Sequence, residues 1–486
     1  MTGGIPRSGF DPGPSCDTRE RMQNVRRALG LGVVAFGMAA ASCGDDTTSG
    51  TTTGGGGDTF RPVSFHADVE PILQQHCLKC HTDGAIGGFS LADYASAKGL
   101  APTIVGQVEA GLMPPFGARD SEECAQRLPW KNDPRLTEDE IAVLRAWSDQ
   151  GTPEGDPAAA PPPFEPPPIG LPNADLELTP VDASIVEGEN DQFTCIVYDP
   201  ALTEDKWVDG IHFIAGNAAV AHHALTFRVD RERAAELSGG AERFPCFGGA
   251  PGDIIHVWAP GGEPFQLPED VGIKLTPDQV VIVQMHYHPI GAAQEDRSTV
   301  QLRFRDEMPS NEFYVTFPGN ASTADEGLLA GPDDRGEPEF RIPANAAEHV
   351  ETMKIEVPKE VFLDLPILMV MPHMHYVGVD LKLEIERLRP PGNQPDSECL
   401  VHTPAWDFGW QRFYEFDVPL SELPTARAGD ILTITCKYDN SKGNPFVAQA
   451  LRDRGMSEPV DVFLGEETLD EMCLVPVGVL VPAGIL

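Results

Sequence analysis

Cysteine and histidine residues stand at spacings that suit metal chemistry in several parts of the chain. The first is the pentapeptide CLKCH, which contains Cys77, Cys80 and His81. C-x-x-C-H is the attachment pattern of haem c: two thiols form thioethers and the adjacent histidine coordinates the iron. The same residues could be half of a zinc site. Because the motif follows an export-type leader and lies among helical signals, we predict one covalently bound haem c.

A second iron ligand is expected downstream of this motif. Met113, in the stretch GLMPPFG, lies on a proline-stiffened loop that resembles the distal methionine loop of small cytochromes c. Histidine and methionine together raise the potential of a haem and suit electron transfer. His66 and His76 are the alternative ligands, and His76, next to the attachment motif, is expected at the surface.

Histidines recur in pairs further along, within AHHALTF, QMHYHP and MPHMHYVG. Side chains two residues apart on a strand point to the same face, so His373 and His375 could hold one metal ion. They could equally be two hydrogen-bonded histidines of a sheet. Copper favours imidazole ligands, and a thioether such as Met472, beside Cys473, helps to hold Cu(I). The isolated histidines are expected to be structural or surface residues: His212, His256, His349 and His402.

The residues around the CLKCH motif carry helical signals. HADVEPILQQHCLKCH has helical spacing, and LTEDEIAVLRAWSDQG begins at a Thr137 cap and closes at Gly151. We expect a small all-α cytochrome c domain at 59–154. The proline-rich stretch that follows predicts a linker at 155–175.

The amino-acid composition and patterning of the sequence change at about residue 176. Short runs rich in Val, Ile, Phe and Thr, such as DQFTCIVYD, QVVIVQMHYH and STVQLRFRD, alternate with turn residues. This pattern predicts an antiparallel all-β region. Its length favours two tandem sandwiches, at 176–315 and 316–486, with RERAAELSGG as a short helix.

Charge and leader point to an exported protein. A formal charge of -40 argues against nucleic acid or anionic lipid as a partner. Two arginines precede the apolar run ALGLGVVAFGMAAAS, so residues 1–42 resemble a bacterial lipoprotein signal with Cys43 as the lipidated residue. The alternative is cleavage near Ala41 by ordinary signal peptidase. Residues 43–58 would be a flexible tether. We expect a periplasmic or cell-envelope lipoprotein whose cysteines without a cofactor role form disulfides.

Five segments of the β region, taken in order, resemble one enzyme family. HHALTF, VIVQMHYH, MPHMHYVG, TITCKYDN and LDEMCLV, within roughly 185–480, are similar to the copper type II, ascorbate-dependent monooxygenases. These include peptidylglycine α-hydroxylating and dopamine β-monooxygenases. The resemblance implies two jelly-roll-like sandwiches with one copper each, and a disulfide between Cys436 and Cys473. Cys195 and Cys246 are candidates for another bridge; Cys124 and Cys399 have no assigned partner.

The resemblance also implies the copper ligands. The first copper, which only relays electrons, would be held by His222, His223 and His286. His288 is the rival for the third place, because it shares a strand face with His286. The second copper, which binds O2 and performs the catalysis, would be held by His373, His375 and Met472. Met374, between the two histidines, would face the opposite way into the packing.

The implied activity is hydroxylation of a C–H bond of a small organic substrate with O2 and two electrons. The electrons would come from a periplasmic donor or an ascorbate-like reductant. In the peptide-amidating branch an arginine stands where this chain has Met371, and Leu474 and Pro476 are also apolar, so we expect a less polar substrate. The alternative is a non-catalytic electron-transfer or copper-holding lipoprotein.

The haem c predicted at the CLKCH motif would be a built-in electron donor at high effective concentration, because it is tethered to the same chain. We expect it to relay electrons from periplasmic carriers to the first copper, while the proline-rich linker at 155–175 keeps the haem within docking reach.

Overall fold

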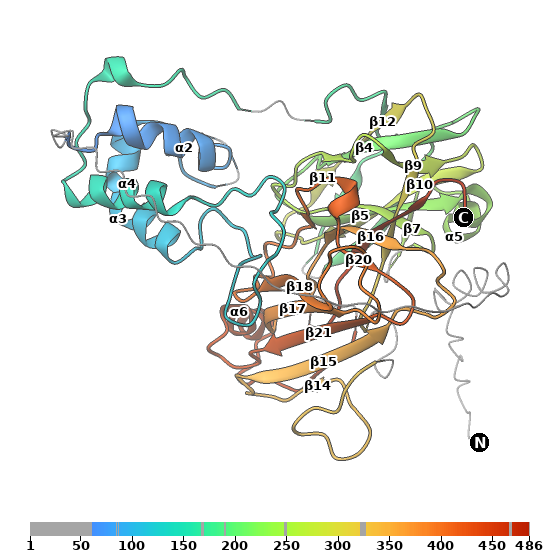
Figure 1. Cartoon of the computed structure of the whole chain (residues 1–486). Coiled ribbons are helices and arrows are strands. Elements are labelled where there is room, and N and C mark those ends of the chain that lie inside the picture. The colour runs from blue at the N-terminus through green and yellow to red at the C-terminus, as the bar shows by residue number, and fades with distance from the viewer. Residues whose placement is uncertain are drawn as a thin grey trace, which may run out of the picture.

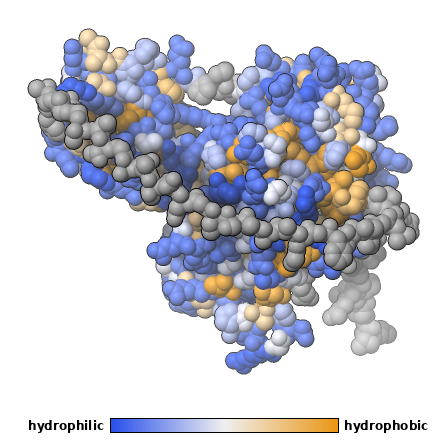
Figure 2. Space-filling model, viewed as in Figure 1, coloured by the Kyte–Doolittle hydropathy of each residue, from blue (hydrophilic) through white to orange (hydrophobic). Residues whose placement is uncertain are grey.

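The computed structural model describes residues 61–83, 85, 87–166, 170–188, 191–246, 250–320, 327–465 and 469–485. The expected export signal at 1–42 and the tether at 43–58, with Cys43, lie outside the described residues. Figure 1 shows a small helical part beside a larger part built of β-sheets. The face drawn in Figure 2 is mostly hydrophilic, in agreement with the net charge of -40. Among the described residues, no helix is both long and apolar enough to cross a bilayer.

The helical part surrounds a core of its own, in which Phe65 and Trp147 are almost fully buried. Its helices are η1 (Phe65–Val69), α2 (Glu70–His76), α3 (Tyr94–Glu109), α4 (Glu138–Asp149) and η2 (Pro157–Ala159). The predicted cap of α4 is confirmed, because Thr137 and Glu140 each accept the other's backbone N–H. Gly151 follows with a φ of 79°, a conformation that glycine adopts without strain.

The β part is mostly antiparallel, as the alternating pattern predicts. Its five-stranded sheet has the order β6 (Arg243–Pro245), β3 (Gln192–Tyr198), β10 (Gln279–Tyr287), β5 (Ala221–Asp230) and β7 (Asp253–Trp258). Its four-stranded sheet has the order β15 (His349–Glu356), β21 (Ile431–Tyr438), β17 (Gly378–Glu386) and β18 (Ser397–Thr403). The short helices of this part are α5 (Arg231–Ser238), η3 (Leu420–Glu422) and α6 (Pro445–Asp453). The first of these is the helix expected at RERAAELSGG.

A ten-stranded sheet runs through both halves of the β part. Its main order is β1 (Leu176–Leu178), β12 (Thr299–Arg305), β4 (Lys206–Ile214), β9 (Val271–Leu275), β13 (Asn311–Thr316), β23 (Val477–Pro482), β16 (Leu365–Val370) and β19 (Tyr414–Glu415). Beside this path, β8 (Phe265–Gln266) pairs with β4 and β20 (Thr425–Ala426) pairs with β16. Two small sheets pair β2 (Ser184–Val186) with β11 (Gln294–Asp296), and β14 (Arg341–Ile342) with β22 (Val462–Phe463).

The two halves meet at β13. This strand pairs in parallel with β9 of the first half and antiparallel with β23 of the second. The five-stranded sheet packs on the first end of the ten-stranded sheet, where the rings of Phe213 and Trp258 lie 5.0 Å apart. Buried residues of the four-stranded sheet, such as Leu383, join the same hydrophobic cluster. The regions 176–315 and 316–486 therefore share one sheet and one core.

Residues 116–131, which we call the docking arm, leave the helical part between α3 and α4 and lie on the second half of the β part (Figure 1). The backbone N–H of Arg119 donates to His402, and the ring of Trp130 stacks on Phe416 at 4.7 Å. The arm also places Phe116 and Trp130 in the main hydrophobic core. The helical part is thus fastened to the β part at a place other than the linker at 155–175.

Three disulfides form among the described cysteines, which confirms the expectation of disulfide bonds. The structure contains the Cys436–Cys473 pair that the family resemblance implies. It also pairs Cys195 with Cys246 and, across the docking arm, Cys124 with Cys399. The last pair joins residues separated by 275 positions. Such bonds are compatible with an exported protein.

Candidate metal centres

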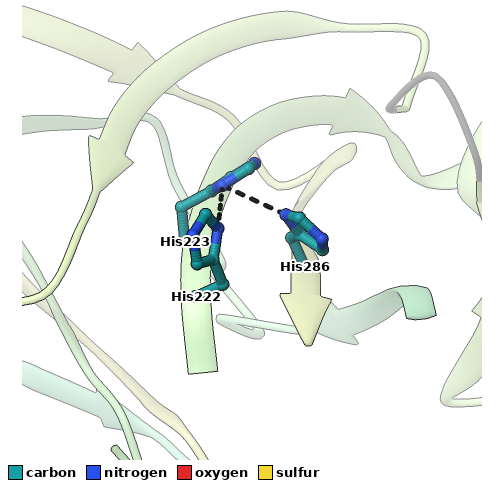
Figure 3. A group of neighbouring side chains, drawn as sticks. All are labelled: His222, His223 and His286. Atoms are coloured by element: carbon teal, nitrogen blue, oxygen red, sulfur yellow. Dashed lines mark hydrogen bonds between the residues drawn. The ribbon is translucent and has the colours of Figure 1, made fainter. Parts of the chain in front are cut away.

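The first histidine group lies on two neighbouring strands of the five-stranded sheet. His223 of β5 is directly opposite His286 of β10, and the register shifts at the next residue, so that Tyr287 faces Ala221. The shift leaves His222 without a partner on β10, as in a β-bulge. Successive side chains of a regular strand face opposite ways, whereas this irregularity lets His222 turn toward the same point as His223 (Figure 3).

The three imidazoles present the same ring nitrogen to one another. Nδ1 of His223 lies 3.2 Å from Nδ1 of His222 and 3.3 Å from Nδ1 of His286. Ligand atoms of all three residues lie within 4.8 Å of one another. A single metal ion could accept the lone pairs of all three nitrogens, which the rings cannot satisfy among themselves.

The electrostatics of this group favour the neutral forms of His222 and His223. Burial, and the positive charge that His286 could carry, lower the pKa of His222 to about 4. Burial and the same neighbour lower the pKa of His223 well below its usual value. A histidine must be neutral to bind a metal ion, so protons would not compete with the metal at neutral pH.

Asp191 lies behind the group and separates the roles of His286 and His288. Its Oδ2 is 3.0 Å from Nε2 of His286, off the line of a hydrogen bond, so this contact is electrostatic. Its Oδ1 is 2.8 Å from Nδ1 of His288, whose side chain is 66% exposed. His286 therefore belongs to the histidine group, and His288 stands outside it as a partner of Asp191.

The second histidine pair lies just beyond β16 rather than within a regular strand. His373 forms an isolated antiparallel bridge with Leu474. Pro372 has no N–H to donate, so the strand cannot continue as an unbroken ladder. The rings of His373 and His375 still lie close, with centroids 5.2 Å apart. Met374 between them is fully buried in the core, as expected.

Hydrogen bonds fix the orientation of each ring in this pair. Nδ1 of His373 lies 2.5 Å from Oε1 of Gln411, whose Nε2 donates to the carbonyl of Phe408. Nδ1 of His375 lies 3.1 Å from the carbonyl of Asp470. Both oxygens can only accept, so each Nδ1 carries the proton. Hydrogen-bonded imidazoles of this kind are the usual ligands of metal ions in proteins.

Met472 lies on the segment that pairs with these histidines. It stands two residues before Leu474, and its side chain is buried. Tyr438 donates its hydroxyl to the carbonyl of Met472 at 2.9 Å, and the Cys436–Cys473 disulfide fixes the next residue. The structure therefore brings the segment that carries the thioether beside the histidine pair.

Sequence reasoning missed Glu471, which ties these two segments together. Its carboxylate is fully buried and accepts the backbone N–H groups of His375, of Met472 at 2.8 Å and of Val377 at 3.3 Å. Burial raises the pKa of Glu471 to about 8, against the opposing effect of these N–H groups. A buried acidic residue beside an expected ligand, in the segment LDEMCLV, is the signal that could have found it.

The CLKCH residues lie on a turn after α2. The helical spacing predicts a helix through the motif, but α2 ends at His76 and Cys77 is its cap. The N–H groups of Cys80 and His81 then donate to the carbonyl of Cys77 at 3.1 and 2.9 Å, which groups the three side chains on one turn. Cys77 and Cys80 are the free cysteines of the described chain. Met113 lies on the loop after α3 and is 37% exposed.

The alternative iron ligands have other partners in this structure. His66 pairs with Glu70 at 2.8 Å. His76 was expected at the surface, and this is wrong: its side chain is 6% exposed, because α4 and the preceding loop cover it. Its two ring nitrogens lie 2.8 Å from the carbonyl of Pro134 and 3.1 Å from Glu140.

The isolated histidines have structural surroundings, as expected. His349 lies 2.6 Å from Glu351 and His402 lies 3.0 Å from Asp380, both inside the fold. His212 and His256 are likewise buried. None of these four belongs to either histidine group among the described residues.

Comparisons with known proteins place this chain in no family. No family model and no curated protein matches it. Among solved structures, "Structure of PNGF-II in C2 space group" is 10% identical with a TM-score of 0.27, over 63% of this chain and 64% of that chain. "Structure of infectious bursal disease virus Gx strain" is 9% identical with a TM-score of 0.17, over 66% and 76%. The chain thus spans less than two thirds of the PNGF-II chain, and TM-scores this low carry no argument about fold or function.

Proposed function

We propose that this protein is an exported copper monooxygenase that hydroxylates a C–H bond of a small organic substrate, with electrons relayed through a fused haem c. One observation carries the proposal. Two separate histidine groups gather imidazoles as a metal site requires: three Nδ1 atoms meet in the first, and two hydrogen-bonded rings lie side by side in the second. The resemblance of five sequence segments to the copper type II monooxygenases supports the same conclusion.

The donor set of the first group fits copper. Three neutral imidazoles suit copper better than magnesium or calcium, which favour oxygen ligands. His222, His223 and His286 would hold this copper, and Asp191 would orient the ring of His286 from behind. With three nitrogen ligands and no nearby thioether assigned, this centre would store and pass on single electrons.

The donor set of the second group also fits copper, in particular its reduced form. His373, His375 and the thioether of Met472 would be the ligands. Copper bound there would supply the O2-dependent chemistry in which substrate, O2, two electrons and two protons give an alcohol and water. Gln411 and Asp470 would fix the two imidazoles, while Glu471 holds the histidine and methionine segments together.

The CLKCH turn fits haem c. Cys77 and Cys80 are free to form thioethers, and His81 follows on the same turn. His81 would be one ligand of the iron and Met113, on the loop after α3, the other. The haem would supply single electrons from a periplasmic donor. The docking arm and the Cys124–Cys399 disulfide would keep the helical part on the β part while it does so.

The neighbourhood of the second pair favours a substrate of low polarity. Met371, Leu474 and Pro476 are apolar and buried. None of them offers the cation that a carboxylate substrate would need at these positions. We also propose that the protein is a periplasmic or cell-envelope lipoprotein, anchored through Cys43.

The experiment that tests this function begins with metal content. Mature protein is loaded with copper, freed of loose metal and analysed beside His375→Ala and Met472→Ala, with His288→Ala as the matched control. We expect one iron and two coppers, one copper in His375→Ala, and two in His288→Ala. The bound haem of the copper-loaded protein is then reduced, and O2 and small apolar compounds are added. Absence of tightly held copper would refute the proposal. Two coppers and reversible haem redox chemistry, without any hydroxylated product, would favour the alternative of a non-catalytic electron-transfer lipoprotein.

A further inference from the structure

One loop of the second half contacts both histidine groups and the docking arm of the helical part. Residues 406–414, which we call the bridging segment, follow β18 and enter β19, with the sequence WDFGWQRFY. Five of these nine residues are aromatic.

The bridging segment contacts the second histidine pair through hydrogen bonds. Oε1 of Gln411 lies 2.5 Å from Nδ1 of His373. Nε1 of Trp406 donates to the carbonyl of Pro372, the residue before His373, at 3.3 Å. These hydrogen bonds place the segment directly beside the second histidine pair.

The same segment contacts the first histidine group through a ring. The centroid of Phe408 lies 5.6 Å from that of His222, with the two planes inclined by 31°. The bridging segment therefore borders both groups.

The far end of the segment contacts the helical part. Gly117 of the docking arm donates its N–H to the hydroxyl of Tyr414 at 3.1 Å, and the ring of Phe116 lies 5.1 Å from the ring of Tyr414. A cavity of about 60 Å³ at this junction is lined by Leu112, which precedes Met113, and by Trp406 and Trp410. The segment thus reaches the neighbourhood of the expected haem ligand.

We infer that the bridging segment is the electron route from the haem to both histidine groups, through Gln411 to the second and through Phe408 to the first. This inference rests on the proposed function. Each transfer moves one electron from ferrous haem iron to one cupric ion, which leaves ferric iron and cuprous copper without making or breaking a protein bond. Electron tunnelling falls steeply with distance and across gaps, so a route of hydrogen bonds and packed rings is favoured. Both electrons of a turnover would then start at the haem, one through each branch of the segment.

The test measures electron transfer without turnover. Copper-loaded protein with ferrous haem is followed by stopped flow in the absence of O2 and substrate, as the haem is oxidised and the cupric signal disappears. His223→Ala removes the first copper, so that only the second accepts electrons. His375→Ala removes the second copper, so that only the first accepts electrons. Gln411→Leu and Phe408→Leu are introduced into each background. Phe446→Leu is the matched control, because its ring packs on Phe408 at 5.9 Å and has no ring contact with a ligand histidine among the described residues.

In the His223→Ala background, Gln411→Leu should slow haem oxidation by about tenfold or more, equal to ~1.4 kcal/mol in the activation free energy. Phe408→Leu and Phe446→Leu should leave that rate unchanged. In the His375→Ala background, Phe408→Leu should slow haem oxidation by a similar factor, while Gln411→Leu and Phe446→Leu should not. Gln411→Glu, which keeps an oxygen facing His373, should retain the parent rate. The haem potential is measured in each variant, so that a change in driving force is recognised.

Two outcomes overturn the inference for different reasons. If iron and copper are bound and the haem is oxidised at the parent rate in both slow variants, the route is wrong and the proposed function stands. If the parent protein binds no haem or no copper, the proposed function fails and the route fails with it. Should Gln411→Leu lose its copper, Trp406→Leu tests the other contact with the second pair, and an unchanged rate there rejects the route to that pair.

Discussion

Replacing Glu471 by alanine should both destabilise the fold and empty the second metal centre. The carboxylate is fully buried and accepts three backbone N–H groups, those of His375, Met472 and Val377. Each N–H left unsatisfied costs about 1 kcal/mol or more, so Glu471→Ala should lower the free energy of unfolding by roughly 3–5 kcal/mol. The histidine and methionine segments would no longer be tied, so copper should be lost from that centre first.

Glu471→Gln separates the two effects. The amide keeps one oxygen, which can still accept from His375 and Met472, and loses the acceptor for Val377. The expected loss of stability is therefore only about 1–2 kcal/mol, and the second copper should be retained with weaker affinity. Urea unfolding of the metal-free protein measures the first quantity, and competition with a copper chelator measures the second.

The matched control is Glu351→Ala. Glu351 is also buried in the second half, where it pairs with His349, but it touches neither metal-ligand segment. Its loss should destabilise the fold while leaving two coppers per chain. If Glu471→Ala holds its second copper as tightly as Glu351→Ala does, then Glu471 is only a stabilising residue and the reasoning is refuted.

Three further predictions follow from single contacts. His223→Ala should remove one copper and leave the second, measured as copper per chain; loss of both would contradict two independent centres. Replacing Cys124 and Cys399 by serine should cost about 2–5 kcal/mol and expose the docking arm to protease, without changing the copper content. Burial lowers the pKa of His256 to about 3 and that of His212 to about 4. Their neutral forms stabilise the fold fully above pH ~6.5, and this is lost as the pH falls toward 4, so changing both to glutamine should reduce the acid loss of stability by roughly 5 kcal/mol in urea unfolding between pH 7 and 4.5.

Much of the framework follows from the sequence because it depends on local patterns. The alternating runs predicted the antiparallel β region, and the cap at Thr137 predicted where α4 begins. The pairing of His223 with His286 is less local, yet both stand in apolar runs that suit neighbouring central strands. Such patterns state which residues are buried, and burial restricts which strands can meet.

Other features depend on contacts between distant residues and could not be predicted. The three-histidine group needs a register shift beside His222, and no residue in that stretch of sequence predicts the shift. Sequence alone does not give cysteine pairing, so the disulfide between Cys124 and Cys399 could not be predicted. Gln411 is an ordinary polar residue until the fold brings it to His373.

The junction between the two halves has a consequence for how the two histidine groups can work together. Where β13 joins β9, the guanidinium of Arg228 lies 3.0 Å from Glu312 of β13 and 2.7 Å from Asp253 of β7, all three inside or at the edge of the core. Opening the halves would break backbone pairing and leave a buried charge unpaired, at a cost of roughly 3–5 kcal/mol for the charge alone. The spacing of the two groups is therefore set by a continuous sheet rather than by a hinge. Any adjustment between them must come from loops, and the bridging segment is the loop that contacts both.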